Sequence, residues 1–287
     1  MGKSSILVTG ATGNIGYYVA SELAAKGEKV RVALMDPEIK GERFKEMGVE
    51  MTKFDFLDPT LFPEALNNVK KIFLIRPPQL AKPKKDMKPF LEAVKEKGIE
   101  QIVFVSLMGV EKNPIVPHRK IEDMIRDSGI GYTFLRPSFF MQNLNTTHRE
   151  DISLRNELYM PVGKAKTSFI DTRDIASVAA TCLIEEGHCN KAYTLTGAKA
   201  IDYKKVGEIL SNTLGRKIEY KNPRTLEFRK NLIKRGTKKE FANVMTILYI
   251  LTRLGTAEKV TEDVRNILKR EPISFEQYAM DFQETWQ

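Results

Sequence analysis

Residues that build covalent or metal-based sites are scarce in this chain. Cys182 and Cys189 are the only cysteines among 287 residues, and they do not form a metal-ligand pattern. Two cysteines are also too few for a disulfide framework in a chain of this length, so we expect reduced thiols and no metal site.

Long apolar runs are absent as well. No secretory signal precedes the first apolar run, and the longest apolar stretch, residues 241–254, is too short and too polar to span a bilayer. These absences favour a soluble, cytoplasmic protein with no membrane partner. The stretch is nevertheless apolar enough to form a subunit interface, and hence a homodimer, or to cover a pocket.

The composition is otherwise that of a globular protein, with 42% apolar and 29% charged residues. The net charge is +9, with local excesses over residues 82–88 and 221–239. Neither stretch carries a nucleic-acid-binding motif, so we expect no nucleic-acid partner. A basic surface of this kind attracts an anionic cofactor.

A glycine-rich turn is the most informative motif present. Residues 9–16 read Thr-Gly-Ala-Thr-Gly-Asn-Ile-Gly and follow the apolar run Ile6–Val8. Gly10 permits a sharp turn after a strand, Gly13 permits close approach of a pyrophosphate, and Gly16 permits tight packing of the following helix. The turn therefore predicts a dinucleotide-binding site at a helix amino terminus.

An acidic residue stands where dinucleotide folds bind the adenosine ribose. Asp36 follows Gly16 by twenty positions and ends the apolar run Val30–Leu34. Since Pro37 comes next, Asp36 is equally readable as a turn residue.

Apolar runs alternate with helical patterns through the first half, which predicts an α/β fold. This fold is a Rossmann-type, doubly wound parallel sheet, with a smaller and mostly helical C-terminal lobe. We expect a nucleotide-binding domain over residues 1–150, its sheet completed by parts of 166–196, and a substrate-side lobe over 151–287. The expected strands are 6–8, 30–34, 49–54, 72–75, 102–105 and 132–135, with helices near 14–26, 38–47, 59–68, 84–98 and 117–128. Further strands are expected at 158–160, 168–170 and 193–195, a helix at 172–184, and a capping box at Ser274 and Gln277.

The chain resembles the NmrA-like branch of the atypical short-chain dehydrogenases/reductases. Besides the glycine turn, the resemblance rests on residues 128–143, 169–176, 193–197 and 271–275. Within the branch, the sequence is similar to type-2 NAD(P)H:quinone oxidoreductases, azoreductase-like proteins and clavine dehydrogenases. The resemblance implies an NAD(P)H cofactor lying across the strand ends.

The resemblance also implies a set of cofactor-binding positions. The pyrophosphate would lie against Gly10, Thr12, Gly13, Asn14, Ile15 and Gly16, and the ribose against Met35 and Asp36. Asp55 and Phe56 would flank the adenine, while Ile75, Arg76, Pro77, Ser106, Pro137 and Phe139 would line the path to the nicotinamide.

The turn after the second strand departs from NADP-preferring relatives. They usually carry an arginine where this chain has Met35, and Asp36 would repel a 2′-phosphate. The turn therefore favours NAD(H), although Lys40 or Arg43 could still reach a phosphate.

The Tyr-x-x-x-Lys pair of short-chain dehydrogenases is missing, because residues 115–128 contain no tyrosine. His118 and Glu122 stand there instead, four residues apart and thus on one helix face. Glu122 would raise the pKa of His118, which would then act as a proton donor. The alternative is a histidine that only orients the nicotinamide ribose. Ser106 either hydrogen-bonds the substrate or caps a turn.

The expected function is an NAD(P)H-dependent reductase of a small-molecule electron acceptor. The acceptor would be a flat electrophile such as a quinone, azo compound or cyclic imine. Its pocket would be lined by Phe139, Phe140, Met141 and Asn143, although core packing is the alternative for the apolar three. His148 and His188 are expected at the surface.

The rival function is a catalytically weak, redox-sensing regulator that binds NAD(P) and transmits its redox state to a protein.

Overall fold

The computed structural model describes residues 4–287, which divide into two compact units. The first unit contains the residues up to Pro137, Thr172–Leu195 and Ile267–Lys269. The second contains Ser138–Asp171, Thr196–Asn266 and Arg270–Gln287. The first unit therefore breaks at Pro137, earlier than the expected boundary at residue 150, because residues 138–171 pack with the C-terminal segments.

A seven-stranded parallel sheet forms the centre of the first unit, in the order β3-β2-β1-β4-β5-β6-β9. This order confirms the doubly wound, Rossmann-type fold. The last strand comes from the chain beyond residue 166, as the sequence predicted. The strands are β1 (Ser5–Val8), β2 (Val30–Leu34), β3 (Glu50–Lys53), β4 (Val69–Leu74), β5 (Gln101–Val105), β6 (Gly131–Pro137) and β9 (Lys191–Leu195).

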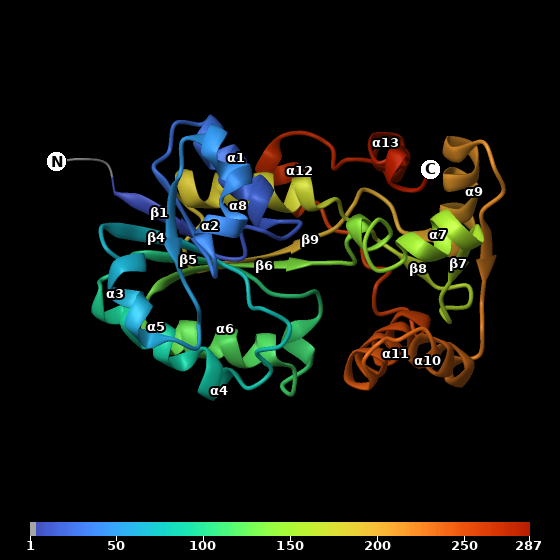
Figure 1. Cartoon of the computed structure of the whole chain (residues 1–287), viewed down its shortest axis with the longest axis horizontal. Helices are drawn as coiled ribbons and strands as arrows, with labels where there is room; N and C mark the ends of the chain where they lie inside the picture. Colours follow the sequence, from blue (N-terminus) through green and yellow to red (C-terminus); the bar gives the residue numbers. More distant parts are fainter. Residues whose placement is uncertain (1–3) are drawn as a thin grey trace. The chain divides into compact units, whose positions relative to one another are not determined.

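Helices cover both faces of this sheet, α1 and α8 on one side and α3, α5 and α6 on the other (Figure 1). Two expected helices are shorter than their patterns suggested: α2 and α3 have four residues each and adjoin 3₁₀ turns at Glu42–Met47 and Pro59–Leu61. The helices are α1 (Gly16–Ala25), α2 (Pro37–Lys40), α3 (Phe62–Ala65), α4 (Pro83–Asp86), α5 (Lys88–Glu96), α6 (Pro117–Ser128) and α8 (Thr172–Ile184).

Burial on both faces explains why these strands read as continuous apolar runs. All five residues of β5 are buried, including Gln101. The Gln101 amide donates to Thr133 Oγ1 and to the carbonyl of Cys182, both at 3.0 Å, so the one polar side chain of the strand is satisfied. All seven strands end at one edge, where dinucleotides bind in this class of fold.

The second unit is mostly helical and has an aromatic core that includes Tyr203, Phe228, Tyr278 and Trp286. Ser274 caps α13 by accepting from the backbone N–H of Gln277 at 3.1 Å, but the Gln277 side chain donates to Asp281 instead of completing the box. Its helices are α7 (Arg149–Arg155), α9 (Tyr203–Leu214), α10 (Thr225–Lys234), α11 (Lys239–Arg253) and α13 (Phe275–Asp281), while α12 (Asp263–Leu268) crosses the unit boundary. Its strands are β7 (Glu157–Tyr159), β8 (Lys166–Thr167), β10 (Ile201–Asp202) and β11 (Glu219–Lys221).

The strand expected at residues 168–170 is wrong in extent. Strand β8 stops at Thr167, and Ile170 makes a single bridge with Phe140. Among residues 4–287, no helix combines the length and apolarity needed to cross a bilayer.

Candidate functional site

The glycine turn between β1 and α1 is packed too tightly for side chains. Gly10 has a φ of +63°, which favours glycine, and a Cβ there would lie 3.2 Å from Ile75. A Cβ on Gly16 would lie 2.3 Å from the carbonyl oxygen of Gly10, a distance that no relaxed backbone permits. Gly13 is less restricted, with 3.3 Å to the same oxygen.

The amino terminus of α1 is open to an anion. Its N-cap is Ile15, no side chain caps it, and its first turn holds no acidic residue. The N–H groups of Gly13 and Tyr17 donate to the carbonyls of Gly10 and Gly13, and the positive end of the helix dipole is left for an external negative group. A pyrophosphate is such a group, so the turn fits a dinucleotide.

Asp36 acts as the N-cap of α2. Its Oδ1 accepts from the backbone N–H of Ile39 at 3.1 Å, which matches the turn-residue alternative and leaves Oδ2 for a ribose hydroxyl. Met35 beside it is exposed.

Arg43 lies against the glycine turn. It donates to the carbonyl of Thr12 at 3.3 Å, and its guanidinium lies 3.9 Å from the centroid of the Tyr17 ring. This cation–π contact keeps a permanent positive charge next to the turn. The sequence offered Arg43 only as one of two cations that could reach a phosphate, because its contact with Tyr17 depends on tertiary packing.

Two buried polar atoms at the carboxyl ends of β4 and β5 have no hydrogen-bond partner within residues 4–287: Arg76 Nε and Ser106 Oγ. Arg76 Nη1 meanwhile donates to the carbonyls of Pro77, Pro78 and Leu80 at 2.9–3.0 Å and so fixes the loop after β4. Native proteins rarely leave buried donors unpaired. Their position at the binding edge fits the hydroxyl and amide groups of a bound nucleotide.

The two positions proposed to flank the adenine differ in availability. Asp55 accepts from the backbone N–H of Leu57 at 2.9 Å and is half-buried. The Phe56 ring is buried edge-on against Phe54 and Phe90, with centroids 4.8 and 5.2 Å away. The Phe56 ring therefore belongs to the core, and any contact of Phe56 with the adenine would come from its backbone.

The proposed coupling of His118 to Glu122 is also wrong. Both Glu122 oxygens bind Arg136, with 3.0 Å to Nε and 2.7 Å to Nη2, and this ion pair raises the pKa of Arg136. Burial and the nearby Arg76 guanidinium lower the pKa of His118 to about 4. His118, which stacks on Phe104, is thus a neutral imidazole at physiological pH. It is able to donate one hydrogen bond, but it does not store a proton as a cation.

The titration of His118 tests this assignment. We expect its imidazole resonances to titrate with a midpoint of about 4, well below the ordinary 6.5. Because the unfolded chain takes up this proton at higher pH than the folded one, His118 lowers stability progressively as the pH falls from about 6.5 to about 4. In H118Q that component of the pH dependence disappears. A midpoint at or above 6.5 in NMR would restore the proton-donor interpretation.

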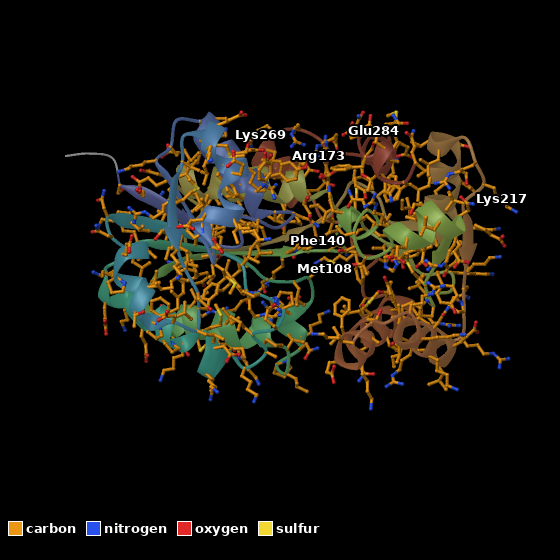
Figure 2. All side chains as sticks on the ribbon, viewed as in Figure 1. Met108, Phe140, Arg173, Lys217, Lys269 and Glu284 are labelled. Carbon is orange, nitrogen blue, oxygen red and sulfur yellow. The ribbon has the colours of Figure 1, made fainter. Side chains whose placement is uncertain are left out.

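The loops after β5 and β6 are tied together in the first unit. Met108 (Figure 2) donates its backbone N–H to the carbonyl of Pro137 at 3.0 Å, and Pro137 itself is buried. This bond fixes the strand edge next to Ser106.

The expected acceptor wall lies in the second unit and divides into two parts. Met141 is buried in the core, as the packing alternative held, whereas Phe140 is half-buried and forms a backbone bridge to Ile170. Phe139 and Asn143 instead line a cavity of about 190 Å³. The other lining residues are Thr147, His148, Phe241, Val244, Met245, Leu248 and Tyr249.

This cavity is mainly apolar, with a polar group at its wall. His148 Nε2 lies 2.5 Å from the Tyr249 hydroxyl, and both residues are buried. The surface expectation for His148 is therefore wrong, because the partner that buries it is distant in sequence. His188 is half-buried, and its Nδ1 lies 2.9 Å from the Tyr193 hydroxyl.

A larger depression of about 330 Å³ lies on the first unit between α3 and α5. It is lined by residues such as Phe62, Pro89 and Lys97 and includes none of the candidate residues. We assign it no part in the site, because it holds neither an unpaired buried group nor a strand end.

Comparisons with known proteins agree with this architecture. The model of the NmrA-like family matches residues 2–279. Prestalk A differentiation protein A of Dictyostelium discoideum is 33% identical over 281 residues, covering 97% of this chain and 92% of that protein. The NAD(P)H azoreductase of Xenophilus azovorans is 31% identical over 279 residues, 96% of each chain.

Among solved structures, the NADPH-dependent quinone oxidoreductase of Escherichia coli complexed with NADPH has the same fold. Its TM-score is 0.87 at 22% identity, and the match covers 97% of this chain and 99% of that one. Family model, sequence relatives and fold coincide over nearly the whole chain. The chain belongs to the NmrA-like family.

Proposed function

We propose that this protein is an NAD(P)H-dependent reductase of a flat electrophilic acceptor such as a quinone, azo compound or cyclic imine. The observation that carries the proposal is the open glycine turn together with the unpaired Arg76 Nε and Ser106 Oγ at the strand ends. The similarity to an NAD(P)H azoreductase and to an NADPH-dependent quinone oxidoreductase supports this class of reaction.

Each part of the cofactor has residues suited to hold it. The glycine turn and the α1 amino terminus would bind the pyrophosphate, and Asp36 a ribose hydroxyl. Ser106 and the loop held by Arg76 would border the nicotinamide. A bound reduced nicotinamide supplies a hydride, which the acceptor takes up together with a proton.

The acceptor cavity of about 190 Å³ suits a small planar ring. Drug-sized ligands occupy pockets of roughly 300–1,000 Å³, so a single-ring acceptor is favoured over an extended one. Phe139 offers an apolar wall for such a ring, and it stacks near Tyr249 at 6.4 Å between centroids. His118 would supply at most a hydrogen bond, so the proton that balances quinone reduction would come from solvent.

Steady-state oxidation of NADH and NADPH with small quinones and azo dyes tests the proposal. We expect acceptor-dependent turnover, and in Y249F a raised KM for the acceptor with unchanged cofactor affinity. Tight cofactor binding without turnover on any of several acceptors would favour the redox-sensing regulator instead. The observation that favours this second function is the missing Tyr-x-x-x-Lys pair.

The choice between NADH and NADPH depends on two opposed charges. Asp36 favours NAD(H), as the sequence suggested, while Arg43 beside Thr12 provides a cation for a 2′-phosphate. We expect R43A to raise the KM for NADPH about tenfold, the worth of one charge-assisted hydrogen bond, and to spare NADH. D36N keeps the helix cap and is expected to improve NADPH use. Equal effects of R43A on both cofactors would show that Arg43 does not bind the 2′-phosphate.

A further inference from the structure

The outer face of α11 is apolar where a soluble protein normally carries polar residues. The buried side of this helix is formed by residues such as Met245, Tyr249 and Thr252. On the opposite side stand Val244, Ile247, Leu251 and Leu254, with exposed fractions of 52%, 57%, 38% and 74%. Their spacing of three, four and three residues places them in one row along the helix.

The exposed apolar side chains are concentrated in this part of the chain. Seventeen large apolar side chains are exposed among residues 4–287, and nine of them lie between residues 226 and 254. Contiguous apolar surface of this kind marks a binding face rather than random exposure. The nine are Leu226, Ile233, Phe241, Val244, Ile247, Leu248, Ile250, Leu251 and Leu254.

Positive charge gathers on the same helical hairpin. Residues 224–254 contain eight basic and two acidic side chains, a net charge of +6 out of +9 for the whole sequence. Arg235 is paired with Asp151. Four lysines are exposed and form no ion pair within residues 4–287: Lys230, Lys234, Lys238 and Lys239.

Helices α10 and α11 form one layer, because they pack on each other and on a shared core. Phe228 of α10 contacts Tyr249 of α11, with ring centroids 5.4 Å apart. Leu226, Lys230 and Ile233 lie on the side of α10 away from Phe228. The apolar row and the lysines are thus presented by the same hairpin.

We propose that the α10–α11 hairpin docks on an anionic lipid bilayer, with the α11 row in the acyl boundary and the lysines at the headgroups. A Lys-rich rim around Phe, Leu and Ile is the composition of helices that lie in the membrane interface. A second copy docked through this face would bring two groups of unpaired lysines together, so charge favours a lipid surface. This proposal departs from the expectation of no membrane partner, which rested on the lack of a segment long enough to span a bilayer.

The biological role of this docking rests on the proposed function. Lipid-soluble quinones reside in bilayers, and a reductase held at the interface meets them there. Phe241, Val244 and Leu248 of the same helix line the acceptor cavity, so docking would bring that cavity next to the lipid. Lipid binding itself requires no turnover and is measurable separately.

Flotation with vesicles tests the docking. We expect the full-length protein to float with vesicles of equal parts phosphatidylglycerol and phosphatidylcholine, weakly with phosphatidylcholine alone, and less as salt is raised. I247E/L251E removes two apolar contacts outside the cavity lining and should weaken partitioning about tenfold or more. K234Q/K238Q should weaken it by a similar factor, on the anionic vesicles only.

Two matched variants control for general effects of added or removed charge. L154E/M280E alters exposed apolar residues elsewhere in the second unit, and K84Q/K85Q alters exposed lysines of the other basic stretch. Both should float like the wild type. All four variants should keep wild-type turnover with a water-soluble quinone, which separates failure of docking from failure of the proposed function. No flotation of the wild type, or a dimer in solution that I247E/L251E dissociates, would overturn the proposal.

Discussion

Replacing Gly16 with alanine is expected to weaken NAD(P)H binding by about 100-fold or more and to lower stability by about 1–3 kcal/mol. The new Cβ would lie 2.3 Å from the carbonyl oxygen of Gly10 and 2.9 Å from the Cα of Ala11. Both neighbours are backbone atoms, so α1 must move away from β1. That movement displaces the helix amino terminus from the position in which it would hold the pyrophosphate.

Fluorescence titration of NADH and urea unfolding measure the two effects. A25G, in the exposed last turn of the same helix, is the control, because it costs helix stability of about 0.5–1 kcal/mol without touching the turn. A G16A protein with cofactor affinity close to that of the wild type would show that the turn is not the cofactor site.

Removal of the Glu122 carboxylate is expected to be the most destabilising of the site substitutions, at about 3–5 kcal/mol for E122A. Glu122 is fully buried, and both its oxygens hold Arg136, whose side chain is only 15% exposed. The substitution leaves the Arg136 guanidinium with the half-exposed Glu111 carboxylate, 3.5 Å away, in place of a buried bidentate partner. Below its melting temperature, however, folded E122A should retain kcat, because Glu122 positions β6 against α6 and does not adjust the pKa of His118.

Urea unfolding and initial rates on the same preparation distinguish the two roles. E111A is the matched control, since Glu111 lies 3.5 Å from the same arginine but is 45% exposed, so its loss should cost below about 1 kcal/mol. Lost turnover in E122A with unchanged stability would return Glu122 to the catalytic site.

The fold of the nucleotide-binding half was predictable because it depends on short-range features of the sequence. A parallel sheet buried on both faces yields apolar runs, and the Gly10 turn is imposed by backbone geometry. All six expected strands up to Leu135 therefore coincide with β1–β6. The strand expected at 168–170 was wrong in extent because Ile170 forms an isolated bridge with Phe140, whereas Ser168 donates its N–H to the carbonyl of Ala257.

The chemistry of the site was less predictable, because partners come from distant elements. A four-residue interval places His118 and Glu122 on one helix face, but it says nothing of Arg136, which arrives on β6 and takes both oxygens. The burial of His148 could not be predicted either, because the residue that covers it, Tyr249, lies 101 positions later in the sequence.

From the sequence, the apolar segment 241–254 could form either a subunit interface or the cover of a pocket. In the structure Phe241 and Leu248 line the cavity, whereas Ile247 and Leu251 face outward. Helical periodicity alone separates these faces, but the core that fixes which face is buried comes from other elements.

Anaerobic transfer of deuterium from C4-labelled NADH or NADPH to a small quinone tests the central claim most directly. The account predicts that reduced cofactor and quinone disappear in equal amounts, more slowly with deuterium than with protium, and that G16A abolishes the reaction. Bound cofactor that remains reduced in the presence of quinone would contradict the account and identify the protein as a binder of NAD(P) without hydride transfer.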